Sequence, residues 1–231
     1  MKELYVFCEG PTEQGFCQQV LRPFLFPQSE GIIHTILIAN SRKRNVISRG
    51  GIRKYAPLRN DIINTLNQHQ RSNVHFTTLF DLYALPPDFP GKAIQQRNPH
   101  DPHPYVAALE TALGEDIGDH RFLPYLQLHE YETLLFADVN SFQYAFENCD
   151  EEIAQLQAIV DDHQSVEHIN DGPQTAPSKR IIQIFPRYYG LKTSAGPDIA
   201  EYTGINQLRA KCPHFNQWFT TLVDMMSGDE S

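Results

Sequence analysis

The chain has 231 residues, of which 41% are hydrophobic and 20% are charged, so its composition is typical of a folded globular protein and excludes a disordered one. Its formal net charge is −9, and its apolar stretches are far shorter than the roughly 20 residues that cross a bilayer. The four cysteines show no C-x-x-C spacing, which argues against a zinc knuckle and against a disulfide framework. We therefore expect a cytoplasmic protein without membrane association.

Strand and helix patterns alternate along the chain. Short apolar runs bounded by turn-forming residues predict strands at 4–8, 32–39, 74–80 and 122–128. Apolar residues at helical spacing predict helices from Thr12 to a stop at Pro23, near 58–66, at 105–113, across the acidic region 139–163, and from Pro177 onward. Strands that alternate with helices favour an α/β fold, with a mainly parallel sheet flanked by helices.

These elements divide the chain into two expected parts. Residues 1–140 should form an α/β core, with a basic loop inserted at 40–59 and a proline-rich loop at 84–104. Residues 141–231 should be a helical part that packs on the core and completes it. The aromatic-rich segment 215–222 fits either core packing or a partner interface, and core packing is the simpler interpretation.

Positive charge is concentrated in one segment. Residues 31–60 carry seven basic side chains and no acidic one: Arg42, Lys43, Arg44, Arg49, Arg53, Lys54 and Arg59. Such segregation permits a local phosphate-binding surface on an acidic protein, so we predict that the first six contact the backbone of DNA or RNA. A solvated loop without a binding role would have the same composition.

Acidic residues follow three of the predicted strands. Glu9 follows the first strand, Asp81 the third, and both Glu130 and Glu132 the fourth. In open α/β sheets the functional crevice lies beyond the carboxyl ends of the strands, so these side chains should converge. Converging carboxylates repel one another unless a hard cation such as Mg²⁺ neutralises them. The sequence therefore predicts a metal site for Mg²⁺ or Mn²⁺.

Each of these residues also has a simpler interpretation. Glu9 and Glu13 would complement the dipole of a helix N-terminus, and Asp81 would stabilise a turn. Glu130 and Glu132 would lie on a solvated face. Ser178 and Lys179 stand at a predicted helix start, where they would either bind a phosphate oxygen or serve only as the first turn.

The histidines give a weaker pattern than the acids. His100 and His103 lie in the proline-rich loop, but no further zinc ligands are evident beside them, so no zinc site is predicted. His129, next to Glu130, is interpreted as a core residue. The glycine-rich motifs that bind the phosphates of nucleotides are absent from the sequence.

Several motifs, taken together, resemble a known family. The segment Glu9-Gly10-Pro11-Thr12-Glu13 resembles the first motif of Toprim domains, the metal-binding fold shared by topoisomerases, primases and OLD-type nucleases. The second Toprim motif is Asp-x-Asp, and Asp81-Leu82-Tyr83 matches only its first acid. Further motifs are Asp81-x-Tyr83-x-Leu85-Pro86, Phe89-Pro90-Gly91, His129-Glu130-x-Glu132-x-Leu134-Leu135-Phe136 and Pro177-Ser178-Lys179-Arg180. Over roughly residues 3–190, this set resembles small stand-alone Toprim-like bacterial proteins, which often resemble the partners of ATPases in phage defence.

The resemblance implies roles for these residues. Glu9, Asp81 and either Glu130 or Glu132 would be metal ligands, and Glu13 would lie behind them or bind a second ion. By similarity to OLD-type nucleases, Lys179 would stabilise the transition state and Ser178 would assist it. Because Tyr83 stands where the motif has its second acid, a two-metal site would need Glu130 or Glu132 in its place.

The leading hypothesis is a Mg²⁺-dependent (or Mn²⁺-dependent) endonuclease or related phosphodiesterase acting on DNA or RNA, with phage defence as an expected setting. A non-catalytic or regulatory Toprim-like subunit that docks on an ATPase is the alternative from another class. A metal-dependent hydrolase of nucleotides is compatible with the same residues. The sequence does not indicate an oligomeric state.

Overall fold

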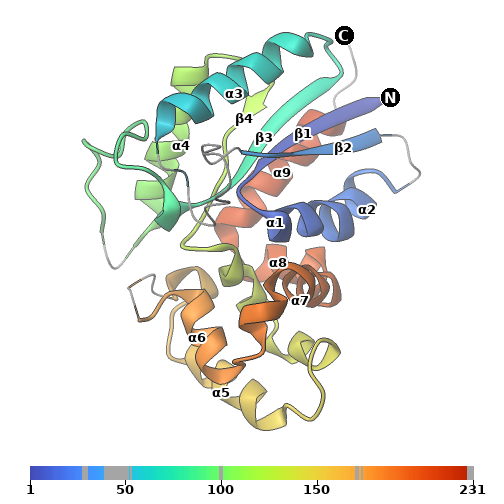
Figure 1. Ribbon diagram of the computed structural model, residues 1–231, viewed down its shortest axis with the longest axis vertical. Coiled ribbons are helices and arrows are strands. Elements are labelled where there is room, and N and C mark those ends of the chain that lie inside the picture. Colours follow the sequence, from blue (N-terminus) through green and yellow to red (C-terminus); the bar gives the residue numbers. More distant parts are fainter. Residues whose placement is uncertain are drawn as a thin grey trace, which may run out of the picture.

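A computed structural model of the chain describes residues 1–27, 31–38, 52, 54–98, 101–169, 172 and 174–227 (Figure 1). Five of the predicted nucleic-acid contacts, Arg42, Lys43, Arg44, Arg49 and Arg53, lie outside these residues, as does His100. Within the described ranges, every helix is too short or too polar to cross a membrane.

The described strands form one parallel sheet, as the sequence predicts. The strands are β1 (Lys2–Cys8), β2 (Gly31–Leu37), β3 (Val74–Asp81), β4 (Phe122–Leu123) and β5 (Leu126–Gln127). Their order is β2-β1-β3-β4, β5 also pairs with β3, and all pairs are parallel. The sheet thus confirms the expected α/β class, and its central strands β1 and β3 end side by side.

The fourth predicted strand is divided into β4 and β5. Pro124 has no backbone N–H with which to continue the ladder. Instead, the Tyr125 N–H donates to Thr78 Oγ1 over 2.8 Å, and that hydroxyl donates to the Tyr125 carbonyl over 2.7 Å. A buried threonine of β3 therefore bridges the break, so β5 stays in register and Glu130 stays near the end of β3.

Helices cover both faces of the sheet. In β1, Tyr5 and Phe7 join the core under α3 (Tyr55–Gln68) and α4 (His103–Ile117), whereas Leu4 and Val6 join the core on the opposite face. This alternation follows from the two-residue period of a strand. Figure 1 shows α3 and α4 on one side of the sheet and α9 (Pro213–Ser227) running along the other.

The last helix places the predicted aromatic segment in the core. Phe215, Phe219 and Leu222 are completely buried, and Trp218 is 4% exposed. The Trp218 indole N–H donates to Thr77 Oγ1 of β3 over 2.9 Å, so even its polar atom is satisfied. Core packing is therefore confirmed for residues 215–222.

Between the sheet and α9 the chain forms a helical part. Its elements are the 3-10 helices η3 (Tyr131–Ala137), η4 (Val139–Tyr144) and η5 (Val166–His168), and the α-helices α5 (Asp150–Asp161), α6 (Pro177–Ile184), α7 (Tyr188–Thr203) and α8 (Ile205–Lys211). In Figure 1, α5 and α6 lie farthest from the sheet, while α7 lies beside α1.

Two predicted boundaries need correction. The basic loop was expected to reach residue 59, but α3 begins at Tyr55, whose N–H is held by the Asp88 carboxylate at 3.1 Å. Arg59 is therefore helical and pairs with Asp116 at 2.7 Å rather than belonging to a loop. The proline-rich loop was expected to reach residue 104, but α4 begins at His103, because proline is well suited to the first turn of a helix.

Pro23 does not end the first helical segment, contrary to the prediction. Helix α1 (Pro11–Phe16) passes into a π-helical turn, η1 (Cys17–Leu21), and then into α2 (Arg22–Leu25). The wider turn resets the hydrogen-bond ladder and places Pro23 in the first turn of α2, where a missing N–H is tolerated.

Helices α1 and α7 approach closely beside the strand ends. A Cβ added at Gly15 of α1 would lie 2.6 Å from Pro197 Cγ of α7. Gly15→Ala should therefore destabilise the protein by about 1–3 kcal/mol, the usual cost of overpacking. Gly190→Ala is the control, because nothing lies within 4 Å of its Cβ position. Urea unfolding of both variants measures the difference, and equal free energies of unfolding would contradict this close approach.

Candidate functional site

The carboxyl ends of β1, β3 and β5 surround a pocket of about 220 Å³. Its lining residues are Glu9, Thr12, Glu13, Asp81, Tyr83, Ala84, Glu130, Tyr131, Glu132 and Lys192. The structure thus brings together all five carboxylates that the sequence nominated. Their role as metal ligands remains a prediction.

Backbone N–H groups hold four of the carboxylates in place. The Asp81 N–H donates to Glu9 Oε1 and the Tyr131 N–H donates to Asp81 Oδ1, each over 2.8 Å. Glu13, in the first turn of α1, accepts from the Gly10 N–H over 2.8 Å, a capping contact. These bonds link the ends of β1, β3 and β5 and fix the acids before any ligand binds.

The fourth such bond explains the position of Ser178. Its backbone N–H, in the first turn of α6, donates to Glu130 Oε2 over 2.9 Å. Lys179, the next residue, is exposed and is not among the residues that line the pocket. The catalytic roles predicted for Ser178 and Lys179 remain predictions, but the structure places only Ser178 against an acid of the site.

Glu130 and Glu132 both face the pocket because the backbone changes direction between them and β5. His129 adopts a left-handed conformation (φ 63°), Glu130 is extended, and Glu132 lies in the first turn of η3. Two residues that are two apart would share one face of a regular strand but not of a helix. Here the transition from strand to 3-10 helix brings both to the pocket, where each is 6% exposed.

Burial and mutual repulsion make the acids costly to ionise together. Burial, with the Glu13 charge, raises the pKa of Glu9 to about 8, and burial, with the Glu132 charge, raises that of Glu13 to about 7. Burial and the charge of Glu9 raise the pKa of Asp81 well above its usual range, and burial and Glu132 also raise that of Glu130. A divalent cation would remove this repulsion, and an all-oxygen donor set suits Mg²⁺ or Mn²⁺.

Lys192 is the one basic side chain that lines the pocket within the described ranges. It projects from α7, and its Nζ lies 2.8 Å from Glu132 Oε1. Burial alone would lower the pKa of Lys192, but the Glu132 charge outweighs it and the pKa is raised. The amine therefore stays protonated in the pocket.

Lys192 was not predicted from the sequence because the helix that carries it was not predicted either. Helix α7 contains Gly190, Gly196 and Pro197, which interrupt the apolar spacing of a helix. Close packing against α1 explains two of them: a Cβ at Gly196 would meet Thr12 Cγ2 at 3.1 Å, and Pro197 lies against Gly15. In the sequence alone, two glycines and a proline within eight residues are typical of a loop.

The predicted nucleic-acid surface is represented in the structure by one residue. Lys54, immediately before α3, is exposed. The remaining members of that set lie outside the described residues, so the surface stays a prediction.

The fold and the pocket together define an α/β protein with an acidic site at the carboxyl edge of a parallel sheet. The chain belongs to the family described as a domain of unknown function (DUF4276), whose model matches residues 8–223. The matched range includes all the residues that line the pocket. Comparison with curated proteins gave no match, and comparison with solved structures gave none.

Proposed function

We propose that this protein is a Mg²⁺- or Mn²⁺-dependent enzyme that cleaves phosphodiester bonds in DNA or RNA, with a Toprim-type site. The observation that carries the proposal is the pocket at the strand ends, where five carboxylates meet one lysine. Carboxylates alone would favour a cation, but a lysine beside them adds a partner for an anion. This combination suits a phosphate group bound next to a divalent cation.

The residues divide between two tasks. Glu9, Asp81 and Glu130 would hold the ion, with Glu13 and Glu132 completing the negative charge around it. The bound ion would supply Lewis-acid stabilisation of the charge that develops on the phosphate. Lys192, kept protonated by Glu132, would donate to a phosphate oxygen.

The size of the pocket favours a polymer over a free nucleotide. Its volume of about 220 Å³ is below the roughly 300–1,000 Å³ of pockets that enclose small molecules. A phosphodiester group fits such a space while its bases remain outside. The basic residues at 42–54 would then contact the flanking backbone, which gives salt-dependent affinity with little base specificity.

A non-catalytic subunit that docks on an ATPase is the second candidate. The observation that favours it is Tyr83, which lines the pocket at the position of the second acid of the Toprim motif and is 57% exposed. In either case we place the protein in the cytoplasm, since all four cysteines are free and buried, and we suggest phage defence as the setting.

The test is cleavage of supercoiled plasmid, single-stranded DNA and RNA with Mg²⁺, Mn²⁺ or EDTA. We expect metal-dependent cutting by the wild type and a loss of about 100-fold or more in Glu9→Gln, comparable to other losses of transition-state electrostatics. Glutamine keeps an oxygen to accept the Asp81 N–H, so the fold should survive while the charge is lost.

Glu115→Gln is the matched control, because Glu115 is exposed and lies outside the pocket. It should cleave at the wild-type rate. Folded wild-type protein that binds Mg²⁺ through Glu9 but cuts none of the substrates would overturn the enzyme proposal in favour of the non-catalytic subunit.

A further inference from the structure

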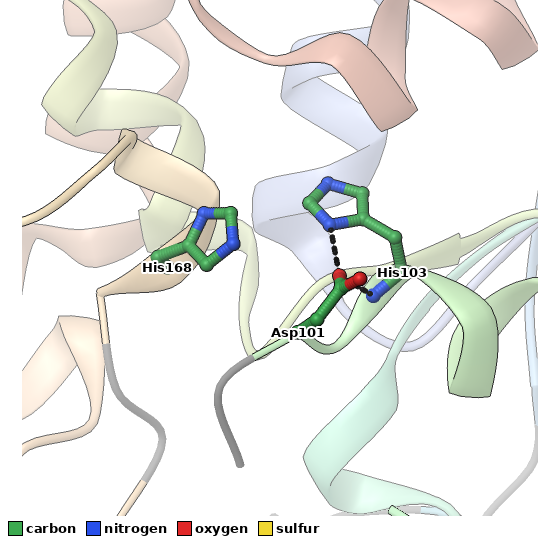
Figure 2. Close-up of side chains that lie close together, drawn as sticks. All are labelled: Asp101, His103 and His168. Atoms are coloured by element: carbon green, nitrogen blue, oxygen red, sulfur yellow. Dashed lines mark hydrogen bonds and ion pairs between the residues drawn. The ribbon is translucent and has the colours of Figure 1, made fainter. Parts of the chain in front are cut away.

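A second cluster of potential metal ligands lies outside the carboxylate pocket. It consists of Asp101 and His103 at the start of α4 and His168 at the end of η5. One ligand atom from each residue lies within 4.8 Å of the others, and His103 Nδ1 is 3.0 Å from Asp101 Oδ1. Figure 2 shows the His168 ring directed toward this pair.

The partners of the two histidines determine which ring nitrogens face the cluster. His103 Nε2 is 2.9 Å from Glu167 Oε2, a completely buried carboxylate. His168 Nδ1 is 2.7 Å from Ser165 Oγ. The opposite nitrogens, His103 Nδ1 and His168 Nε2, are therefore the ones directed toward Asp101. Metal-binding histidines typically have their second nitrogen held by a carboxylate or another polar group in this way.

Glu167 is itself held rigidly. The backbone N–H groups of His214 and Phe215 donate to its carboxylate at 3.0 Å and 3.2 Å. This places a fixed negative charge behind His103, which would orient the ring and increase the basicity of Nδ1. In contrast, Asp101 and His103 are partly exposed, with side-chain exposures of 49% and 31%, so an ion could enter from solvent.

We propose that Asp101, His103 and His168 form a binding site for a transition-metal dication of the Zn²⁺ type, distinct from the carboxylate pocket. Two imidazoles and one carboxylate favour such an ion, whereas Mg²⁺ prefers oxygen ligands alone. Bonds of about 2.0–2.1 Å place two ligands of a tetrahedral ion about 3.3 Å apart, close to the observed separation of His103 and Asp101. The His168 ligand atom lies within 4.8 Å of the other two, so its side chain would turn toward the ion on binding, and a fourth position would remain for water.

The ion would join two parts of the fold. Asp101 and His103 lie at the start of α4, which packs on the sheet, whereas His168 belongs to η5 in the helical part. The His129 Nε2 contact to the Glu167 carbonyl, at 3.0 Å, connects this region to Glu130 of the carboxylate pocket. Metal binding should therefore stabilise the arrangement of the helical part beside the candidate active site.

The test is calorimetric titration of the metal-free full chain with Zn²⁺ in excess Mg²⁺, together with the visible spectrum of added Co²⁺. We expect one Zn²⁺ per chain, a tetrahedral Co²⁺ spectrum and a higher melting temperature. In His168→Ala, Zn²⁺ affinity should fall by about 100-fold or more, beyond the roughly 10–100-fold cost of losing an outer-shell partner. Circular dichroism without metal checks that this variant is folded.

Two further variants test whether Zn²⁺ binds at this cluster or elsewhere on the protein. His120→Ala removes a histidine whose side chain is 94% exposed, so it should leave Zn²⁺ binding unchanged. Asp81→Asn alters the carboxylate pocket and should also leave it unchanged, which makes the result independent of the proposed nuclease. Equal Zn²⁺ affinity in the wild type and in folded His168→Ala would overturn the proposal, and His103 would then be only a hydrogen-bonded link between Asp101 and Glu167.

Discussion

Replacing Lys192 with methionine should lower the rate of metal-dependent cleavage by about 10²–10³-fold, the usual cost of removing one group that stabilises developing charge. Methionine keeps the length and apolar stem of the side chain but removes the cation that faces Glu132. Mg²⁺ affinity should not fall, because loss of a positive charge makes the pocket more attractive to a second cation. Cleavage rates and calorimetric Mg²⁺ binding measure the two effects separately.

The pH profile of this variant provides a second measurement. The charge of Lys192 lowers the pKa of Glu13 and of Glu130. Without it both pKa values rise, so the residual activity should require a higher pH than that of the wild type. Lys192→Arg should retain part of the rate at the wild-type pH. A Lys192→Met protein that loses Mg²⁺ binding together with activity would contradict a role toward the phosphate.

Lys179→Met belongs in the same experiment because the sequence assigned the catalytic cation to Lys179. Its side chain is exposed and outside the pocket, so we expect a rate near that of the wild type. A large loss in Lys179→Met with normal activity in Lys192→Met would restore the sequence-based assignment.

The metal-free protein should become less stable as the pH rises from about 5 to 8. The pKa of Glu9 is raised from 4.5 to about 8 and that of Glu13 from 4.5 to about 7. In this window the folded state retains protons that the unfolded state releases, so the free energy of unfolding falls with increasing pH. Each retained proton contributes a slope of up to about 1.4 kcal/mol per pH unit.

Urea unfolding in EDTA at several pH values measures this slope. The hydrogen bond to Glu167 raises the pKa of His103 against the effect of burial. Burial lowers the pKa of His214, but its carboxylate partners outweigh burial and raise it, so both histidines also lose stabilising protons as the pH rises. The relevant quantity is therefore the difference between the wild type and the double variant Glu9→Gln, Glu13→Gln, which should have the flatter slope. Mg²⁺ should flatten the wild-type slope as well. Identical slopes in the two proteins would show that the acids do not repel one another as the structure indicates.

The sheet and its acidic edge could be predicted from the sequence because their causes are local. An apolar run followed by an acid, as at residues 4–9 and 74–81, specifies both a buried strand and the residue at its end. Parallel pairing then brings those ends to one edge without further information. The convergence of Glu9, Asp81 and Glu130 followed from this reasoning.

The rest of the site depends on contacts between residues that are distant in the sequence. Lys192 reaches the pocket only because α7 packs closely on α1, and its glycines and proline concealed the helix. His168 lies 65 positions after His103, so neither histidine indicated the other. A ligand cluster assembled by tertiary packing has no characteristic spacing that a single sequence can show.

The position of α7 and α9 in the chain has a consequence for dissecting this protein. A fragment that ends at residue 140 would contain all five acids of the pocket but not Lys192, and it would expose the sheet face that Trp218 and Phe219 cover. During synthesis on the ribosome the growing chain passes through the same state, because the five carboxylates emerge long before Lys192 and α9. The complete pocket therefore requires the chain to be made and folded through α9, and any hydrolytic activity would have to wait for that step.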